Sequence, residues 1–428
     1  MTETSPRERV AVRLRPDAAG PLAGIRVCDL SGQLAGAGAT KYLAAMGAEV
    51  IRIEDPVRKG RWDMLRGLAP FVDERRGNEL GGGFNNHNVE KLGITLNLKS
   101  AGGRALLEDL IACSDVLTEN FAAGVLDRLG FGYERVRSIK PDIVYVSNSG
   151  FGQTGPYRDF KSWGPIVQAV SGLTATVRLP GQPPAGWGLS YMDHHGANFM
   201  AVAILACLLQ RDRTGEGQRI DMACTEAGAY LMTLPTVEQS AAGTFKSSLQ
   251  AHGTNRSTSP AMAPHGVYRC DGHDQWIAVA CRDDSDWAAL AKVVSEPWTT
   301  VARWDTLAGR FAGQDELDHL LGAWLAPRDR DTVQAALLAA GVPAAAVLRP
   351  SERIDADPAT AHWGLFPEVV HDEIGRVRVD GFPLHLSRTD WRAERGAPTL
   401  GRDNDLVFGT LLGRTPEQLA ALHEEGAI

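Results

Sequence analysis

The first 150 residues alternate short apolar runs with longer stretches of helical composition. Runs typical of β-strands stand at 25–30, 49–54, 93–98, 115–120 and 142–149. The stretch "AGAGATKYLAAMGA" (35–48) between the first two runs predicts a helix. Two strands joined by a helix form a parallel βαβ unit. The pattern therefore predicts an α/β fold with an open, mostly parallel, Rossmann-like sheet.

Later segments change in character along the chain. Ser100 precedes "AGGRALLEDLIAC" and is expected to cap a helix, whereas 75–91 is polar, glycine-rich and expected to be an irregular loop. Residues 196–234 are apolar and read as helical. The segment "HGVYRCDGHDQWIAVAC" (265–281) predicts a hairpin, and helices are expected to follow it.

The length of 428 residues favours two domains over one. We expect the N- and C-terminal parts to form the sheet of a large domain, with a smaller α+β domain inserted. The expected parts are a flexible tail (1–20), the first part of the large domain (21–235), a linker (236–265), the small domain (266–340), and a second linker with the return to the large domain (341–428).

Composition excludes several classes of protein. A net charge of -8 argues against a nucleic-acid binder, which would usually be basic. The charged N-terminus has no apolar core typical of a secretory signal, and the apolar run at 197–210 is too short to span a bilayer, so we expect no membrane partner. The six cysteines form no C-x-x-C pair, which argues against a zinc ribbon and favours reduced core thiols. These features indicate a cytoplasmic protein.

Three segments near strand ends are candidates for ligand contact. The loop "DLSGQLAGAGAT" (29–40) either holds a phosphate at a helix N-terminus or packs a strand tightly on a helix. Arg128 in "ENFAAGVLDRLGFG" is either a solvated ion-pair partner or a cation for a phosphate-bearing ligand. The irregular segment "GFGQTGPYRDFKSWG" (150–164) is suited to be one wall of a binding site.

Asp193, in "GWGLSYMDHHGANF" (186–199), has several interpretations. Its position before a helix of small and apolar residues favours a helix cap. A metal site with His194 and His195 is disfavoured, because adjacent helical residues point in different directions. A nucleophilic role requires an ionised carboxylate facing a cleft, and Gly188 and Gly196 would permit such an approach.

The order of several segments resembles the class III CoA-transferase family, which includes formyl-CoA transferase and dicarboxylate-specific relatives. These segments are "PLAGIRVCDLSGQLAG", "MGAEVIRIEDP", "SDVLTENFAAGVLDRLGFG", "PDIVYVSNSGFGQTGPY", "QAVSGL", "YMDHHGA", "RTGEGQRIDM" and "APTLGRDNDLVFGTLLGRTPEQLAALHEEGAI". They extend over nearly the whole chain after residue 20. The resemblance implies the fold of the family, CoA binding by the large domain, and an interlocked dimer in which each chain threads through its partner.

The resemblance also implies a mechanism. The family's catalytic aspartate precedes the helix that leads to "RTGEGQ", and here that position is Asp193. Its carboxylate would form an anhydride with the acyl group and then an aspartyl-CoA thioester, with no metal and no permanently bound cofactor. CoA and acyl-CoA are substrates. The CoA contacts carried over from the family are Gln33, Leu34, Ala35, Leu96, Asn120, Phe121, Arg128, Leu129 and Lys161.

This chain departs from the family's pattern at three places. Ala37 replaces a usual proline, Asp55 stands near where formyl-CoA transferase has a basic residue, and "HGTNRSTSP" replaces a run of glycines. Formate and oxalate are therefore not the expected acids. The extended "GWGLSYMDHHGA" instead resembles relatives that handle larger dicarboxylates or aryl-substituted acids, which makes Trp187, Tyr191, His194 and His195 candidates for substrate contact.

Two alternatives stay open. A 2-methylacyl-CoA racemase or epimerase of this fold uses a His–Asp pair, but Trp163 occupies the position of that His. The chain could also be the non-catalytic subunit of a heteromeric CoA-transferase, although it has the aspartate. A homodimer is the expected assembly.

Overall fold

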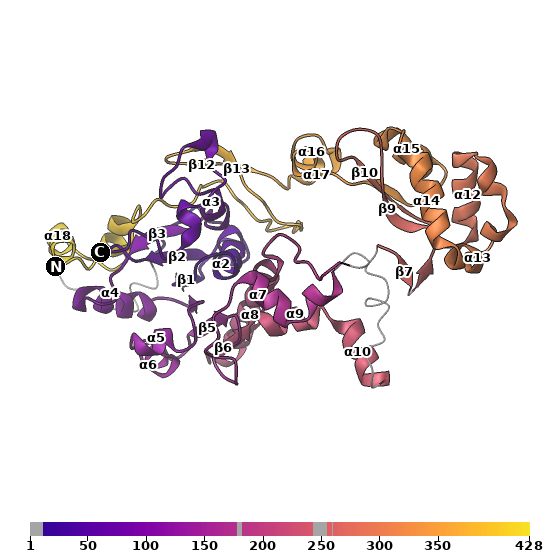
Figure 1. Ribbon diagram of the computed structural model, residues 1–428. Helices are drawn as coiled ribbons and strands as arrows, with labels where there is room; N and C mark the ends of the chain where they lie inside the picture. The colour runs from indigo at the N-terminus through magenta and orange to yellow at the C-terminus, as the bar shows by residue number, and fades with distance from the viewer. Residues whose placement is uncertain (1–11, 178–181, 243–254, 259) are drawn as a thin grey trace. The chain divides into compact units, whose positions relative to one another are not determined.

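The protein is described by a computed structural model over residues 12–177, 182–242, 255–258 and 260–428 (Figure 1). The chain divides into two compact units. The first comprises 1–173, 186–232 and 359–428, and the second comprises 174–185 and 233–358. Residues 1–11 of the expected tail, and residues 243–254 and 259 of the expected linker, lie outside the described residues.

A six-stranded parallel sheet organises the first unit, in the order β3-β2-β1-β4-β5-β6. Its strands are β1 (Arg26–Asp29), β2 (Glu49–Glu54), β3 (Leu92–Thr95), β4 (Val116–Glu119), β5 (Val144–Ser149) and β6 (Arg219–Ala223). β1 pairs on one side with β2 and on the other with β4, so that Val27 lies opposite both Val50 and Val116. The predicted Rossmann-like α/β sheet is confirmed.

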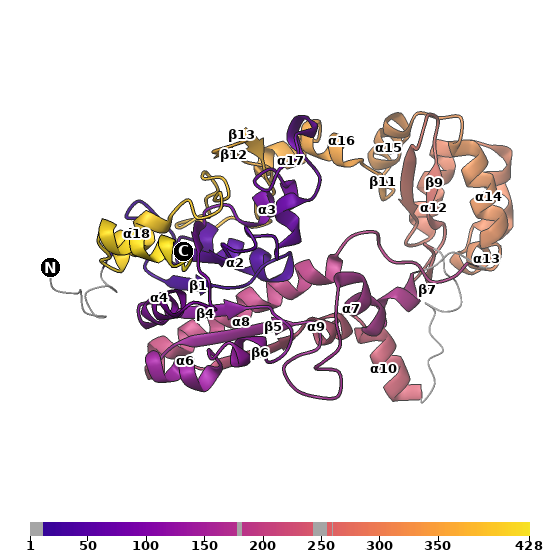
Figure 2. The same ribbon diagram turned by 60° about the vertical axis from the view of Figure 1, so that its left-hand side comes forward.

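The two faces of this sheet are covered by different helices (Figures 1 and 2). α2 (Ala35–Ala45) and α8 (Tyr191–Thr214) pack on one face. α4 (Ala101–Ala112), α5 (Val125–Arg128) and α6 (Tyr133–Ile139) pack on the other. Because both faces are covered, even polar side chains of the strands, such as Arg26, Asp29 and Arg52, are buried and need hydrogen-bond or ion-pair partners.

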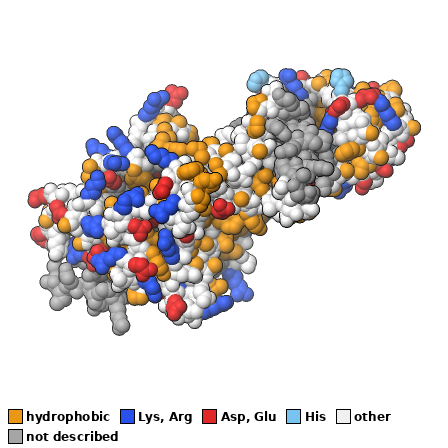
Figure 3. All heavy atoms as spheres, turned by 60° about the horizontal axis from the view of Figure 1, so that its bottom comes forward, with side chains coloured by type: hydrophobic (Ala, Val, Ile, Leu, Met, Phe, Trp, Pro, Cys, Tyr) orange, Lys and Arg blue, Asp and Glu red, His pale blue; other side chains and the backbone are white. Residues whose placement is uncertain are grey.

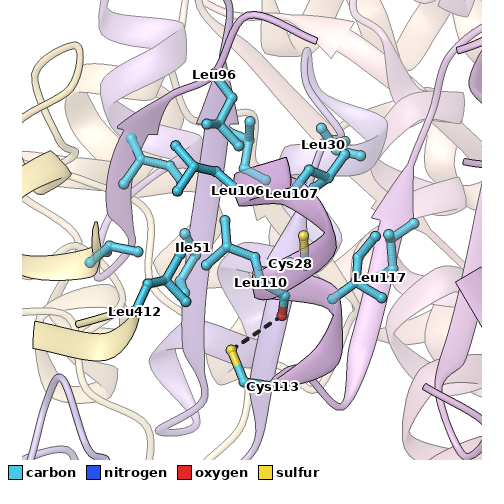
Figure 4. Close-up of a cluster of buried hydrophobic side chains, with 14 of the residues drawn as sticks. Cys28, Leu30, Ile51, Leu96, Leu106, Leu107, Leu110, Cys113, Leu117 and Leu412 are labelled. Atoms are coloured by element: carbon cyan, nitrogen blue, oxygen red, sulfur yellow. Dashed lines mark hydrogen bonds between the residues drawn. The ribbon is translucent and has the colours of Figure 1, made fainter. Parts of the chain in front are cut away.

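Alternation along each strand sends neighbouring side chains into different cores. Val27 points toward α2 and α8, whereas Cys28 points toward α4. Figure 4 shows the second of these cores, where Leu106, Leu107 and Leu110 of α4 lie over the strands. Cys113 ends this helix, and its thiol donates to the Leu110 carbonyl oxygen at 3.3 Å. At the other end, the Ser100 hydroxyl accepts from the Gly103 N–H at 2.9 Å, so the predicted cap is present.

The C-terminal segment returns to the first unit and covers the sheet edge. It contains β12 (Glu368–His371), β13 (Gly375–Arg378), the π-helix η6 (Asp405–Leu411) and α18 (Pro416–Glu424). The carboxylate of Asp403 and the amide oxygen of Asn404 accept the Gly93 and Thr95 N–H groups at 2.7 and 2.9 Å. Side chains of the C-terminal segment therefore accept hydrogen bonds from backbone N–H groups of the edge strand β3. The expectation that the C-terminal part adds a strand to this sheet is wrong in that detail, because β12 and β13 pair with each other as a separate two-stranded sheet, and Val370 of β12 also bridges to Arg395.

Three local expectations in the first unit need correction. The segment 75–91 contains a short helix, α3 (Gly82–His87), and is not wholly irregular. The helical segment expected from residue 196 begins earlier, at Tyr191 of α8. It also contains β6, whose pattern was missed because this edge strand is partly exposed and lacks a continuous apolar run. The remaining elements are η1 (Met64–Gly67), η2 (Val72–Glu74), α7 (Gly164–Val170), η3 (Leu173–Thr176), α9 (Cys224–Tyr230) and α17 (Pro358–Trp363).

Part of the expected tail is anchored to the first unit. The Glu49 carboxylate accepts from the backbone N–H groups of Leu14 and Arg15 at 2.7 and 3.0 Å. Arg15 also forms an ion pair with Glu90 at 2.6 Å. Leu14 is buried against the sheet. Residues 12–20 thus contribute to packing even though their composition resembles a tail.

The second unit is built around the predicted hairpin. β9 (His265–Arg269) and β10 (Trp276–Ala280) pair antiparallel, and β11 (Ala344–Ala346) extends the sheet. The other elements are α10 (Thr233–Ala242), β7 (Ser257–Thr258), β8 (Ala261–Met262), α12 (Asp284–Val294), η4 (Pro297–Thr300), η5 (Ala302–Trp304), α13 (Leu307–Ala312), α14 (Gln314–Leu325), α15 (Arg330–Ala339) and α16 (Pro350–Asp355). Trp287, Leu321 and Leu337 meet in its core.

By length and composition, α8 could cross a membrane. In the structure its buried residues, among them Met200 and Ile204, pack on α2 and the sheet. This face of the helix therefore belongs to the core of the first unit, as predicted, although the helix is longer than the apolar run 197–210 on which the prediction rested.

Candidate active site

A cavity of about 560 Å³ lies at the carboxyl ends of β1, β4, β5 and β6. This is the edge at which parallel α/β sheets usually bind ligands. All the lining residues belong to the first unit. They are Gln33, Leu34, Ala35, Trp62, Leu65, Asn120, Phe121, Ala122, Ala123, Asn148, Ser149, Gly150, Phe151, Arg158, Phe160, Lys161, Ser162, Trp163, Gly164, Val167, Ser190, Asp193 and Cys224.

Gln33 and Asn120, both predicted from the sequence, line the cavity from neighbouring strand ends. The loop after β1 (residues 30–34, called the β1 loop) brings Gln33 to the cavity. Asn120, at the end of β4, accepts the Gly32 N–H and donates to the Gly32 carbonyl oxygen, both at 2.8 Å. Both polar atoms of the Asn120 side chain therefore hold the β1 loop, and the amide fixes the shape of this wall of the cavity.

Asp193 also lines the cavity, from the first turn of α8. Ser190 is the N-cap and the helix begins at Tyr191, so Asp193 is the third helical residue and the expectation that it caps the helix is wrong. A Cβ on Gly164 would lie 2.7 Å from Asp193 Oδ2. Only glycine leaves room for the carboxylate there. The close approach places the carboxylate between the start of α7 and the start of α8.

Opposing effects act on the charge of Asp193. Burial raises its pKa above the ordinary value, while the Ser190 hydroxyl and the neighbouring His194 act to lower it. The N-terminus of a 24-residue helix also favours a negative charge. The result is a partly desolvated carboxylate that is more basic than a solvated one, which suits a nucleophile.

Cys224, at the start of α9, faces the same region. Its thiol donates to the Asn148 amide oxygen at 3.2 Å, and a Cβ on Gly196 would lie 2.8 Å from its sulfur. Burial, with the charge of Asp193, raises the pKa of Cys224 to about 12. A thiol held protonated does not compete with the carboxylate as a nucleophile.

The segment after β5 (residues 150–163, called the β5 loop) supplies the most exposed part of the lining. Phe151, Tyr157 and Phe160 pack on one another with ring centroids 4.8 to 6.1 Å apart. Arg158 and Lys161 are exposed cations beside these rings. The loop thus combines aromatic faces with positive charge, as a site for a phosphate-bearing aromatic ligand requires.

Arg128, Leu96 and Leu129 do not line the cavity. Arg128 is exposed at the end of α5. A Cβ on Gly124 would lie 3.1 Å from Arg128 Nη1 and 3.7 Å from Arg158 Nη2, so the two guanidinium groups approach the same point. Leu96 is buried in the core beneath α4, and Leu129 packs against that core (Figure 4).

The four proposed substrate residues around Asp193 lie outside the cavity lining. Trp187, Tyr191 and His195 form a ladder that continues to Phe199, with successive ring centroids 4.6, 6.1 and 4.9 Å apart. His194 instead faces the buried His87, with ring centroids 5.5 Å apart. One helical residue turns the side chain by about 100°, so neighbours of Asp193 cannot share its direction.

Sequence reasoning missed Trp62, Leu65, Asn148, Ser190 and Cys224 as lining residues. The ends of β5 and β6 could have indicated Asn148 and Cys224, had β6 been recognised as a strand. Trp62 and Leu65 follow β2 at a distance, and only folding brings them to β1. Within the described ranges, no group of three or more His, Cys, Asp and Glu side chains could hold a metal ion.

The desolvation of Asp193 predicts that Asp193→Asn stabilises the protein at neutral pH. Because the folded-state pKa is raised, stability is lost as the pH rises from the unfolded-state pKa, and the loss is complete above the folded-state pKa. The variant should have a higher thermal midpoint than the wild type at about pH 7.5, and the difference should shrink toward about pH 4. Asp17→Asn, which changes an exposed carboxylate, is the control. A wild type as stable as Asp193→Asn at neutral pH would contradict the prediction.

Comparison with known proteins agrees with this geometry. The sequence profile of CoA-transferase family III matches residues 22–404. The chain is 32% identical to a succinyl-CoA–D-citramalate CoA-transferase of Chloroflexus aurantiacus, over 95% of this chain and 98% of that protein. It is 31% identical to a formyl-CoA:oxalate CoA-transferase of Streptomyces coelicolor, over 95% and 99% of the two chains.

Solved structures show the same fold. A CaiB/BaiF family protein from Brucella suis superposes with a TM-score of 0.82 at 27% identity, covering 92% of this chain and all of that one. The match to the family profile and the identity to these relatives extend over almost the whole chain. The chain belongs to CoA-transferase family III and is a CoA-transferase of that family.

Proposed function

We propose that this enzyme moves CoA from an acyl-CoA donor to a carboxylic acid acceptor through covalent intermediates on Asp193. The observation that carries the proposal is the partly buried Asp193 carboxylate, which faces a cavity of about 560 Å³ at the carboxyl edge of the sheet. The cavity is large enough for the thioester end of an acyl-CoA.

The first half of the reaction releases the donor acid. The Asp193 carboxylate attacks the thioester carbonyl carbon, the C–S bond breaks, and CoA leaves as a thiolate. The thiolate then attacks the aspartyl carbonyl of the mixed anhydride. The bond between the aspartyl carbonyl carbon and the bridging oxygen breaks. The donor acid departs as a carboxylate with this oxygen, and Asp193 becomes an aspartyl-CoA thioester.

The second half repeats these steps in reverse. The acceptor carboxylate attacks the aspartyl thioester and expels CoA thiolate, which then attacks the acceptor carbonyl of the new anhydride. Acyl-CoA leaves and the Asp193 carboxylate is restored. The thioester energy is conserved, so the steps require neither a metal nor a redox group. Water must be kept from the anhydride, and the packed walls around Gly164 and Cys224 serve this purpose.

We place the CoA moiety along the β1 and β5 loops. Gln33, Leu34, Ala35 and Phe121 provide the wall, and Lys161 stands at the exposed side. Arg128 and Arg158, which converge near Gly124, are suited to the phosphates of CoA. Asn120 acts indirectly by holding Gly32.

Relatives support carboxylic acids as the other substrates. Similar proteins are named for succinate, citramalate and oxalate. We propose a dicarboxylate or an aryl-substituted acid for this chain, and a transfer screen with succinyl-CoA and acetyl-CoA as donors would identify the pair. Trp163, at the position of the racemase histidine, lines the cavity next to the Asp193 wall. This supports transfer over racemisation.

We also propose that the enzyme is a homodimer. α8 presents an exposed row of apolar residues formed by Phe199, Val202, Leu205 and Leu209, and Tyr230 of α9 lies beside Phe199. Hydrophobic side chains gather in a band over the region of α7 to α9 (Figure 3). Apolar surface of this extent favours burial against another chain. All six cysteines are buried and none forms a disulfide, which supports a reducing compartment such as the cytoplasm.

Removal of the nucleophile should abolish the reaction. Asp193→Ala is expected to lower CoA transfer by at least about a thousandfold. Hydroxylamine should inactivate the wild type only when acyl-CoA is present, because it attacks the aspartyl thioester. Ser190→Ala, which retains the carboxylate, should retain most of the transfer. Undiminished transfer by Asp193→Ala would remove this residue from the mechanism.

Removal of either converging arginine should weaken CoA binding. Arg128→Ala and Arg158→Ala are each expected to raise the Kd for CoA about fivefold at low salt, with a smaller effect at high salt. Titration calorimetry measures this. Arg135→Ala serves as a control, because Arg135 pairs with Glu108 on the surface at 2.7 Å. An unchanged Kd in Arg128→Ala would show that Arg128 does not contact CoA.

The proposed assembly can be measured by sedimentation. The wild type should sediment as two 46.0 kDa chains, and Val202→Lys should lower the fraction of dimer because it places a charge in the apolar row. Leu338→Lys, an exposed change in the second unit, should have no effect. A wild-type monomer would contradict the proposal, and co-purification of a second, related chain would show a heteromer.

A further inference from the structure

Beneath one wall of the cavity lies an ion pair that does not itself line it. Arg52 of β2 and Asp63 are both fully buried, with Arg52 Nη2 at 2.8 Å from Asp63 Oδ2. Directly above the pair are Gln33 and Trp62, which do line the cavity. The pair therefore lies directly behind the residues that line the cavity.

The Asp63 carboxylate joins two segments of the wall. Its Oδ2 accepts the Gln33 N–H at 3.1 Å. Its Oδ1 accepts the Leu65 N–H at 3.2 Å and so caps η1. The β1 loop and the residues after β2 are thus held by one buried carboxylate. Hydrogen bonds to an ionised acceptor are stronger than neutral ones.

Gln33 needs such support because of its backbone conformation. Its φ is +58°, in the left-handed region that costs free energy for a residue with a side chain. The Asp63 carboxylate holds its N–H, and its own Nε2 donates to the Trp62 carbonyl oxygen at 3.1 Å. Without these bonds, the β1 loop would relax to a different conformation and move the Gln33 side chain.

Arg52 supports the aromatic part of the same wall. Its guanidinium lies 5.0 Å from the centroid of the Trp62 ring, and this ring lies 5.5 Å from that of Phe121. A Cβ on Gly32 would lie 2.4 Å from Trp62 Cη2 and 2.9 Å from Arg52 Nη2. The loop, the indole and the guanidinium are therefore packed in layers, and a shift of one displaces the others.

The members of the pair depend on each other. Arg52 Nε and Nη1 are buried without a hydrogen-bond partner among the described residues. Asp63 is the direct ion-pair partner of Arg52, the Trp62 ring lies against the guanidinium, and the buried Asp29 carboxylate attracts this charge without a direct contact. Removing Asp63 or Arg52 leaves the other without its direct partner, which is costly in the interior.

We propose that Arg52 and Asp63 are positioning residues for the CoA thioester. They fix Gln33 in its left-handed conformation and Trp62 on the guanidinium, and so determine where the wall meets the ligand. This inference rests on the proposed function, because it assumes that CoA binds along the β1 loop. If the proposal is correct, substitution of either residue changes the KM for acyl-CoA and the Kd for CoA more than it changes kcat.

The chain offers a matched control pair. Glu54 of β2 and Arg66 of η1 are also buried, with Arg66 Nε at 2.8 Å from Glu54 Oε1, and Arg66 lies 3.8 Å from the Phe84 ring centroid. The same two elements therefore carry a second buried ion pair over an aromatic ring. This pair does not bond to Gln33 or Trp62.

Steady-state kinetics and calorimetry with the full chain distinguish the two pairs. Asp63→Asn is expected to raise the KM for acyl-CoA and the Kd for CoA about tenfold, with kcat within about threefold of wild type. Glu54→Gln should leave KM and Kd within about twofold, since a loss of folded protein lowers kcat without changing KM. Thermal unfolding of both variants shows whether their stabilities are comparable.

A second substitution decides the question if Asp63→Asn does not fold. Arg52→Lys keeps a cation for Asp63 but loses the planar group under Trp62, so KM and Kd should rise by about threefold. An unchanged KM and Kd in the folded variants, or an equal rise in Glu54→Gln, would overturn the proposal. A wild type that binds CoA without transferring it would refute the proposed function alone, because the Kd comparison still tests the pair.

Discussion

The parallel pairing of β1 with both β2 and β4 is the constraint on which the site depends. From β1 the chain enters α2, which covers one face of the sheet, whereas from β4 it enters α5, which covers the other. The two loops therefore diverge and leave a crevice between them. The side-chain amide of Asn120, after β4, bonds both backbone groups of Gly32, after β1. These two bonds fix the separation of the two loops.

The carboxylate of Asp193, the proposed nucleophile, lies where burial disfavours its charge and nearby groups favour it. Desolvation disfavours the charge of Asp193, and the start of a long helix with the Ser190 hydroxyl compensates in part. Gly164 and Gly196 allow the surrounding backbone and the Cys224 sulfur to approach closely. A site of this kind sacrifices stability for reactivity, as functional sites commonly do.

The sequence predicted the sheet well, because short runs rich in Val and Ile mark the strands and α2 separates the first two of them. It also predicted Asp193, Gln33 and Lys161 as candidate site residues through the family's motifs, and all three line the cavity. It could not predict the Arg52–Asp63 pair, since only folding brings the segment after β2 under the β1 loop. It also placed the start of α8 too late. That error made Asp193 a cap and obscured the rotation that turns His194 and His195 away.

α8 connects the chemistry to the proposed assembly. One face of the helix packs on α2 and the sheet through Ala197, Met200 and Ile204, and this packing fixes its N-terminal turn. A different face carries the exposed row that includes Val202 and Leu209. Because a helix is stiff over this length, a partner that covers the exposed row would also restrain the turn that holds Asp193. Dimerisation would then contribute to the preorganisation of the carboxylate, even if the partner supplied no group to the cavity.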